Sequence, residues 1–182
     1  MGKWLKRSAW LAGVFVVAMG ALGAVAWWHS ERALATVHAV QDPSLVFVGD
    51  EAEATRGAHL YAVLGCVDCH GADARGKFVF DAMPVARIVG SNLTPAAIAG
   101  RYDANQLAAA IRHGVREDGR PLKFMPVGDF QHLSDADTAA LVRHLQSLPP
   151  SDNAPGATVI GPMGRVLHLF GKFDLAPAEH LD

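Results

Sequence analysis

The sequence predicts an all-α domain that follows a single N-terminal transmembrane helix. One observation is an uncharged apolar run at residues 8–28. Another is a set of segments in which apolar residues recur at three- and four-residue steps, the period of an amphipathic helix. The third is the pentapeptide Cys66-Val67-Asp68-Cys69-His70, which holds both cysteines of the chain. Together they predict a membrane anchor at 1–28, a tether at 29–50, the main domain at 51–150 and a C-terminal tail at 151–182.

The run at 8–28 is long enough to cross a bilayer. As a helix it spans about 31 Å at 1.5 Å per residue, close to the thickness of the hydrocarbon core. Basic residues precede it and a pair of tryptophans closes it, namely Lys3, Lys6, Arg7, Trp27 and Trp28. The positive-inside rule therefore places the N-terminus in the cytoplasm and the rest of the chain in the periplasm, on the outer side of the bacterial inner membrane.

A cleavable signal peptide is the alternative, because Ala24-Val25-Ala26 has the small-x-small pattern of a cleavage site. The apolar run exceeds the roughly 7–15 residues usual in such peptides, which favours a retained anchor. Residues 29–50 then read as a tether, with a helical start from Glu31 to His38 and a break at Asp42-Pro43. From residue 29 onward the chain carries 13 basic and 18 acidic side chains, a formal charge of −5. This charge argues against nucleic-acid binding.

Three longer helices are expected in the main domain. The first covers 51–65 and leads directly into Cys66; the second, 104–113, begins at a capping box formed by Asp103 and Gln106. The third, 135–148, begins at Ser134 and is ended by Pro149-Pro150. Gly57 of the first helix and His144 of the last are expected where these two helices cross. Residues 77–101 show no regular periodicity except a short helix expected after Thr94-Pro95, and the tail shows only an apolar patch, Val166 to Phe170.

The pentapeptide predicts covalent attachment of one haem c. In this chemistry each thiol adds to one vinyl group of the porphyrin, and the histidine binds the iron. Three other roles fit less well. Such a short disulfide loop is usually redox-active rather than structural, a thioredoxin-like pair would need a βαβ context, and a zinc site would need about four ligands. We therefore predict Cys66 and Cys69 as attachment points and His70 as an iron ligand.

The order of helix, haem motif, loops, helix, Met-Pro and helix resembles class I cytochrome c over roughly residues 51–150. The residues that carry the likeness are Cys66 to Gly71, Met125-Pro126 and Leu145 to Pro150. More narrowly, Asn92 to Pro95, Ile111 to Val115 and Asp118 to Leu122 resemble the first haem domain of membrane-anchored cytochrome c subunits of periplasmic dehydrogenases. Those proteins usually continue into a second haem domain, and Leu175 to His180 resembles the connector to it. A natural single-haem form and a truncated multi-haem form both remain open.

The resemblance implies that Met125 is the second axial ligand of the iron. A thioether is a soft donor, and a His/Met pair raises the reduction potential. Met83 is also followed by proline but lies only 13 residues after His70, a short reach around the porphyrin. The carbonyl of Pro84 or a neighbour is expected to accept a hydrogen bond from His70. Arg87 is a candidate partner for a haem propionate, and Asn92 is either a second one or the start of an Asx turn.

With both axial positions filled, the haem has no site for a substrate, so we expect an electron carrier rather than an enzyme. The expected partners are membrane lipid around the N-terminal helix and redox proteins: a dehydrogenase, a quinol-oxidising complex or a terminal oxidase. The alternative is an open-site haem enzyme of peroxidase type, or a gas-sensing haem module.

Overall fold

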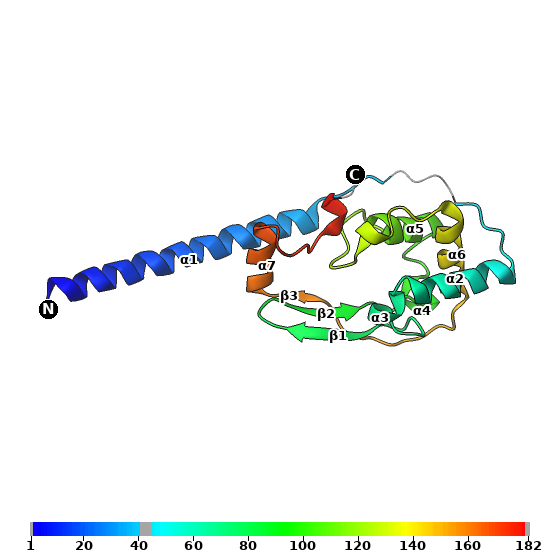
Figure 1. The fold of residues 1–182 in the computed structure, drawn as a ribbon, viewed down its shortest axis with the longest axis horizontal. Coiled ribbons are helices and arrows are strands. Elements are labelled where there is room, and N and C mark those ends of the chain that lie inside the picture. Colours follow the sequence, from blue (N-terminus) through cyan, green and yellow to red (C-terminus); the bar gives the residue numbers. More distant parts are fainter. Residues whose placement is uncertain (1, 41–44, 181–182) are drawn as a thin grey trace.

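A computed structural model describes residues 2–40 and 45–180 of the chain. A long helix projects from a small domain of helices and one sheet (Figure 1). In chain order the elements are α1 (Lys3–Ala35), α2 (Glu51–Val63), α3 (Cys66–His70), β1 (Lys77–Ala82), β2 (Ala86–Gly90), α4 (Pro95–Ile98), α5 (Ala104–His113), η1 (Val127–Asp129), α6 (Asp135–Ser147), β3 (Val159–Ile160), α7 (Pro162–Leu169) and η2 (Pro177–His180).

Helix α1 is the one helix among the described residues that is long and apolar enough to cross a membrane. It does not end at residue 28 but continues to Ala35, where Thr36 caps its last carbonyls. Of the helical start expected for the tether, Glu31 to Ala35 therefore form part of α1, whereas residues 36–38 are not helical. The break expected at Asp42-Pro43 lies outside the described residues.

Helices α2 and α6 cross at the point expected from the sequence, with Gly57 facing His144. A β-carbon built on Gly57 would lie 1.9 Å from the carbonyl oxygen of Ala140 and 2.7 Å from the Cβ of His144. Only glycine allows the two backbones to approach this closely. The crossing is central to the main core, where Tyr61, Leu141 and Leu145 are buried.

We therefore expect Gly57→Ala to destabilise the domain by about 3 kcal/mol, near the upper end for overpacking, because a backbone carbonyl cannot move aside as a side chain can. Chemical denaturation followed by circular dichroism would measure the change. Gly128→Ala is the matched control, since a β-carbon there would meet no atom within 4 Å. An unchanged denaturation midpoint for Gly57→Ala would contradict the close packing of the two backbones.

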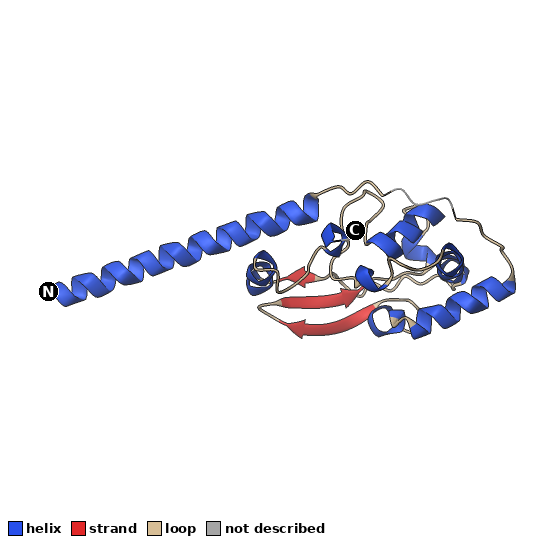
Figure 2. Cartoon of the chain, turned by 45° about the horizontal axis from the view of Figure 1, so that its top comes forward, coloured by secondary structure: helices blue, strands red, loops and turns tan. Residues whose placement is uncertain are grey.

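The prediction of an all-α domain is wrong in one respect, because residues 77–90 form an antiparallel strand pair. Lys77 lies opposite Gly90 at one end of the β1–β2 pair, and Ala82 lies opposite Ala86 at the other end. The register is irregular between Phe78 and Phe80. Strand β3 extends the sheet to the order β1-β2-β3 (Figure 2). Its two residues pair with Ala86 and Arg87 across more than 70 positions of sequence. Such a short, irregular strand pair leaves little periodic signal, and its third strand is far away in the chain.

The tail also contains more structure than expected. Helix α7 replaces the predicted apolar patch and begins with Pro162, whose fixed φ suits the first helical position. Downstream, Leu175 and Ala176 are completely buried in a second core together with Ala86 and Ile88 of β2. The tail therefore belongs to the folded body that surrounds the sheet and the end of α1.

The caps predicted for the two later helices are confirmed. The Asp103 side chain accepts from the backbone N–H of Gln106, and the Gln106 side chain accepts from the N–H of Asp103. Ser134 accepts from the N–H of Asp137 at the start of α6. These bonds satisfy N–H groups that a helix leaves without partners at its first turn.

Candidate functional site

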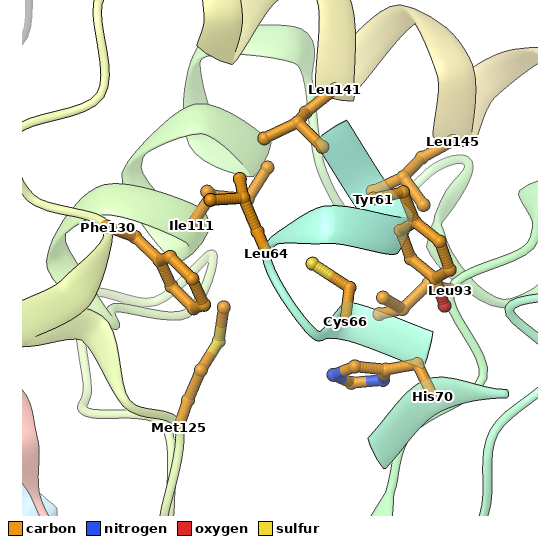
Figure 3. A pocket seen from close by; sticks show the side chains of 10 residues that line it. All are labelled: Tyr61, Leu64, Cys66, His70, Leu93, Ile111, Met125, Phe130, Leu141 and Leu145. Atoms are coloured by element: carbon orange, nitrogen blue, oxygen red, sulfur yellow. The ribbon is translucent and has the colours of Figure 1, made fainter. Parts of the chain in front are cut away.

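The Cys-x-x-Cys-His segment forms the short helix α3, which follows α2 after a single break. Gly65 makes that break with a left-handed φ of 77°. Residues four apart lie on one face of a helix, so Cys66 and His70 point into the same space. Figure 3 shows both side chains directed into one chamber. Burial raises the pKa of the Cys66 thiol to about 11, so before any covalent reaction it is protonated at neutral pH.

The imidazole of His70 is held by a backbone carbonyl, although not by the one expected. Its Nδ1 lies 2.8 Å from the carbonyl oxygen of Ser91, whereas the Pro84 carbonyl accepts from the N–H of Met163. A proton on Nδ1 leaves Nε2 free as the ligand atom. Burial lowers the pKa of His70, which favours the neutral imidazole that binds metals.

Gly90 lets strand β2 lie directly against α3, a role that the sequence did not reveal. A β-carbon at this position would lie 1.8 Å from the carbonyl oxygen of Cys69. The adjacent backbone is tied down as well, since the N–H of Gly76 donates to the carbonyl of His70 at 2.8 Å. The sheet therefore packs against the Cys-x-x-Cys-His helix and places the carbonyl of Ser91 within hydrogen-bonding distance of His70.

Met125 faces the motif across the chamber, as the view in Figure 3 shows. Cys66, His70 and Met125 line a small apolar chamber of about 40 Å³ together with Tyr61, Leu64, Leu93, Ile111, Phe130, Leu141 and Leu145. It adjoins a larger cavity of about 500 Å³, which His70, Cys69 and Met125 also line. A cavity of this size is within the range of protein sites for organic ligands.

The loop that carries Met125 is held in place by Phe124, the residue before Met125. Phe124 has a φ of 60°, a rare and costly conformation for a bulky side chain. Its ring stacks on Phe173 of the tail at 5.5 Å and meets Phe80 of β1 edge-on at 6.0 Å. Sequence reasoning missed Phe124, because both aromatic contacts come from distant parts of the chain.

Asn92 and Arg87 lie in different surroundings. The Asn92 side chain donates to the carbonyls of Ser151 and Asn153 at 2.7 and 3.0 Å and accepts from the N–H of Thr94 at 2.9 Å. It therefore forms the Asx turn that was one of its two expected roles, and it also lines the larger cavity. The structure does not bring Arg87 to that cavity; its guanidinium pairs with Asp81 at 2.7 Å on the neighbouring strand. Its contact with a propionate stays a prediction without structural support.

Two other arginines line the larger cavity and were missed at the level of sequence, namely Arg101 and Arg116. Each is already paired with an acid, Arg101 with Glu117 at 2.6 Å and Arg116 with Asp118 at 2.8 Å. The sequence signal was weak, because Arg116 adjoins a charged turn that reads equally well as solvated, and Arg101 is a single charged residue between Gly100 and Tyr102.

The residues present fit a covalently held haem. His70 and Met125 line both the small chamber and the larger cavity, Cys66 lines the first and Cys69 the second. Two thiols, an imidazole and a thioether are the donor set of a haem bound through Cys-x-x-Cys-His with a His/Met iron. His70 and Met125 would hold the iron, and Cys66 and Cys69 would hold the ring.

Comparisons with known proteins identify the family of the domain. The sequence profile of the cytochrome c family matches residues 54–149. The chain is 33% identical to a nicotinate dehydrogenase subunit from Pseudomonas putida over 80% of its length and 13% of that protein. It is 30% identical to the fructose dehydrogenase cytochrome subunit of Gluconobacter japonicus over 56% of its length and 22% of that protein. Against a diheme cytochrome c-type protein of Cereibacter sphaeroides the identity is 33%, over 62% of the chain and 42% of the relative. The chain thus spans less than half the length of each of these relatives.

Proposed function

The chain belongs to the cytochrome c family and carries one covalent haem c at its Cys-x-x-Cys motif, and from this premise we propose that it is a membrane-anchored electron carrier of the periplasmic side. In the proposal His70 and Met125 are the axial ligands. The haem supplies reversible one-electron exchange when bound.

The observation that carries the proposal is the position of Met125 opposite His70 across a chamber with apolar walls (Figure 3). If protein atoms fill both axial positions, none is left for a substrate or oxygen. The chain's own residues then have three tasks. They hold the two ligands, exclude water from them, and keep the site rigid so that little reorganises when an electron arrives.

Rigidity is supported on both sides of the chamber. On one side the Ser91 carbonyl orients His70, and Gly90 packs β2 against α3. On the other side, Phe124 is locked between two rings and the N–H of Val127 donates to the carbonyl of Met125 at 2.8 Å. Because His70 and the loop of Met125 are each held by neighbouring groups, both side chains need little movement to stay bound to the iron in either oxidation state.

We further propose that the redox partner is a dehydrogenase. The support is that two of the similar proteins are named as subunits of a nicotinate and a fructose dehydrogenase. Affinity purification in mild detergent, followed by mass spectrometry of the co-purifying polypeptides, tests this assignment. Recovery of a quinol-oxidising complex or a terminal oxidase instead would replace it.

Carbon monoxide tests the ligation in the unmutated protein. We expect the absorption spectrum of the dithionite-reduced protein to stay unchanged under carbon monoxide, because Met125 occupies the only position where the gas could bind. A prompt spectral change at neutral pH would show an open position and would favour a peroxidase-like or gas-sensing haem instead.

Retention of the anchor is tested separately. The Ala24-Val25-Ala26 sequence lies inside α1, and Ala26, Ser30 and Ala33 are buried there. Since these residues pack on the folded domain, we expect the native protein to stay in the membrane after alkaline carbonate extraction, with an intact mass that includes residues 1–26. Soluble protein that begins at Trp27 would instead support a cleaved signal peptide.

A further inference from the structure

Helix α7 has its polar side chains inside and its apolar ones outside. Arg165 and His168 are only 8% and 7% exposed. Met163 and Phe170, by contrast, are 48% and 62% exposed, and Val166 and Leu167 between them are half-buried. A surface helix of a water-soluble domain has the opposite arrangement. We define the outer face of α7 as these four apolar residues: Met163, Val166, Leu167 and Phe170.

The buried polar residues of α7 bind the end of α1. The guanidinium of Arg165 pairs with Glu31 at 2.7 Å and lies 3.8 Å above the ring of Trp27, and it also donates to the hydroxyl of Ser30. The ring of His168 packs 5.3 Å from that of His29. Because a buried guanidinium must have partners, these contacts fix α7 to the segment Trp27–Glu31.

The depth of α7 relative to a bilayer follows from this contact. The uncharged run of α1 ends at Trp28, and tryptophans at the end of such a run lie at the membrane–water interface. Helix α7 packs on this same turn of α1. Figures 1 and 2 show that the axis of α7 is transverse to that of α1. They also place α7 at the end of the domain from which the N-terminal part of α1 projects. With α1 spanning a bilayer, α7 would therefore lie along the membrane surface.

The position of α7 is also fixed against the turn between β1 and β2. A β-carbon on Gly161 would lie 2.1 Å from the carbonyl oxygen of Pro84, and one on Gly164 would lie 2.2 Å from that of Val85. The N–H of Met163 donates to the Pro84 carbonyl at 3.1 Å. The helix therefore cannot roll to bury its outer face, and its exposure is built into the fold.

From these observations we propose that α7 is an interfacial helix whose outer face inserts into the lipid headgroup region beside α1. Lipid is the occupant because the face is apolar, adjoins the membrane span, and lies at the depth of the interfacial tryptophans. Two contacts with the bilayer, one through α1 and one through α7, would hold the haem domain in one orientation to the membrane. The proposal rests on the anchoring proposed above.

Photolabelling of the full holoprotein tests it. The protein is placed in vesicles of phosphatidylcholine and phosphatidylglycerol that contain a phospholipid with a diazirine near its glycerol end. After illumination, mass spectrometry should find lipid adducts on Met163, Leu167 or Phe170 as well as on Trp27 or Trp28. Val63 of α2 should carry none, although it is 61% exposed.

The variant Met163→Glu, Phe170→Glu should lose the adducts on α7 and keep those on α1, because charge opposes insertion. Val63→Glu is the matched control and should keep both sets. Unchanged haem absorption spectra would show that the variants fold, and Met163→Ser, Phe170→Ser is the milder pair if they do not. Adducts on α1 without adducts on α7 would overturn the interfacial helix and leave the anchor standing. Absence of adducts on both helices would overturn the anchor too.

Discussion

Met125→Ala should leave the haem attached but lower the reduction potential of the protein by more than about 0.1 V. The thiols and His70 are unchanged, so covalent attachment does not depend on this side chain. Loss of the thioether removes the soft donor that favours the ferrous state, and axial ligands control potentials over several tenths of a volt. Potentiometric titration would measure the shift. The reduced variant should also bind carbon monoxide, with a clear change in its absorption spectrum.

Met83→Ala is the matched control, because Met83 is likewise followed by proline but is not among the residues that line either cavity. It should change neither the potential nor the response to carbon monoxide. If Met125→Ala behaves like this control, Met125 is not an axial ligand, and the case for an electron carrier loses its main support.

Replacement of both Cys66 and Cys69 by alanine should abolish covalent haem. Each thiol forms one linkage to the porphyrin, and the chain contains no other cysteine. After extraction with acidified acetone, we expect the colour to stay with the unmutated polypeptide and to leave with the solvent for the variant. Haem staining of a denaturing gel would give the same result as presence or loss of a band.

The single variant Cys69→Ala provides the internal control, since one remaining thiol can still form one linkage. It should keep part of the haem stain under the same denaturing conditions. Free extraction of haem from the unmutated protein would contradict covalent attachment through the motif, whatever the variants do.

Local chemistry accounts for what the sequence predicted well. The Cys66–His70 motif, the caps at Asp103 and Ser134 and the uncharged run that became α1 each depend on residues within a few positions of one another. The same holds for Gly57, since a glycine in a helix that faces a second helix predicts a close crossing. These features could be predicted because each depends on residues that lie within one short stretch of the chain.

The remaining features join distant segments, and only the tertiary structure decided them. Strand β2 is paired on one side by β3 from the tail, the His70 ring is held by Ser91 rather than by Pro84, and Phe124 is fixed by Phe173. The inverted faces of α7 have the same origin, because its arginine is buried only when Glu31 and Trp27 of α1 are present to receive it. The sequence by itself therefore determined which cofactor this protein attaches and where the helices α2, α5 and α6 begin. The packing of distant segments determined how the side chains of His70 and Met125 are held and which face of α7 is exposed, because those contacts depend on chain closure and not on local pattern.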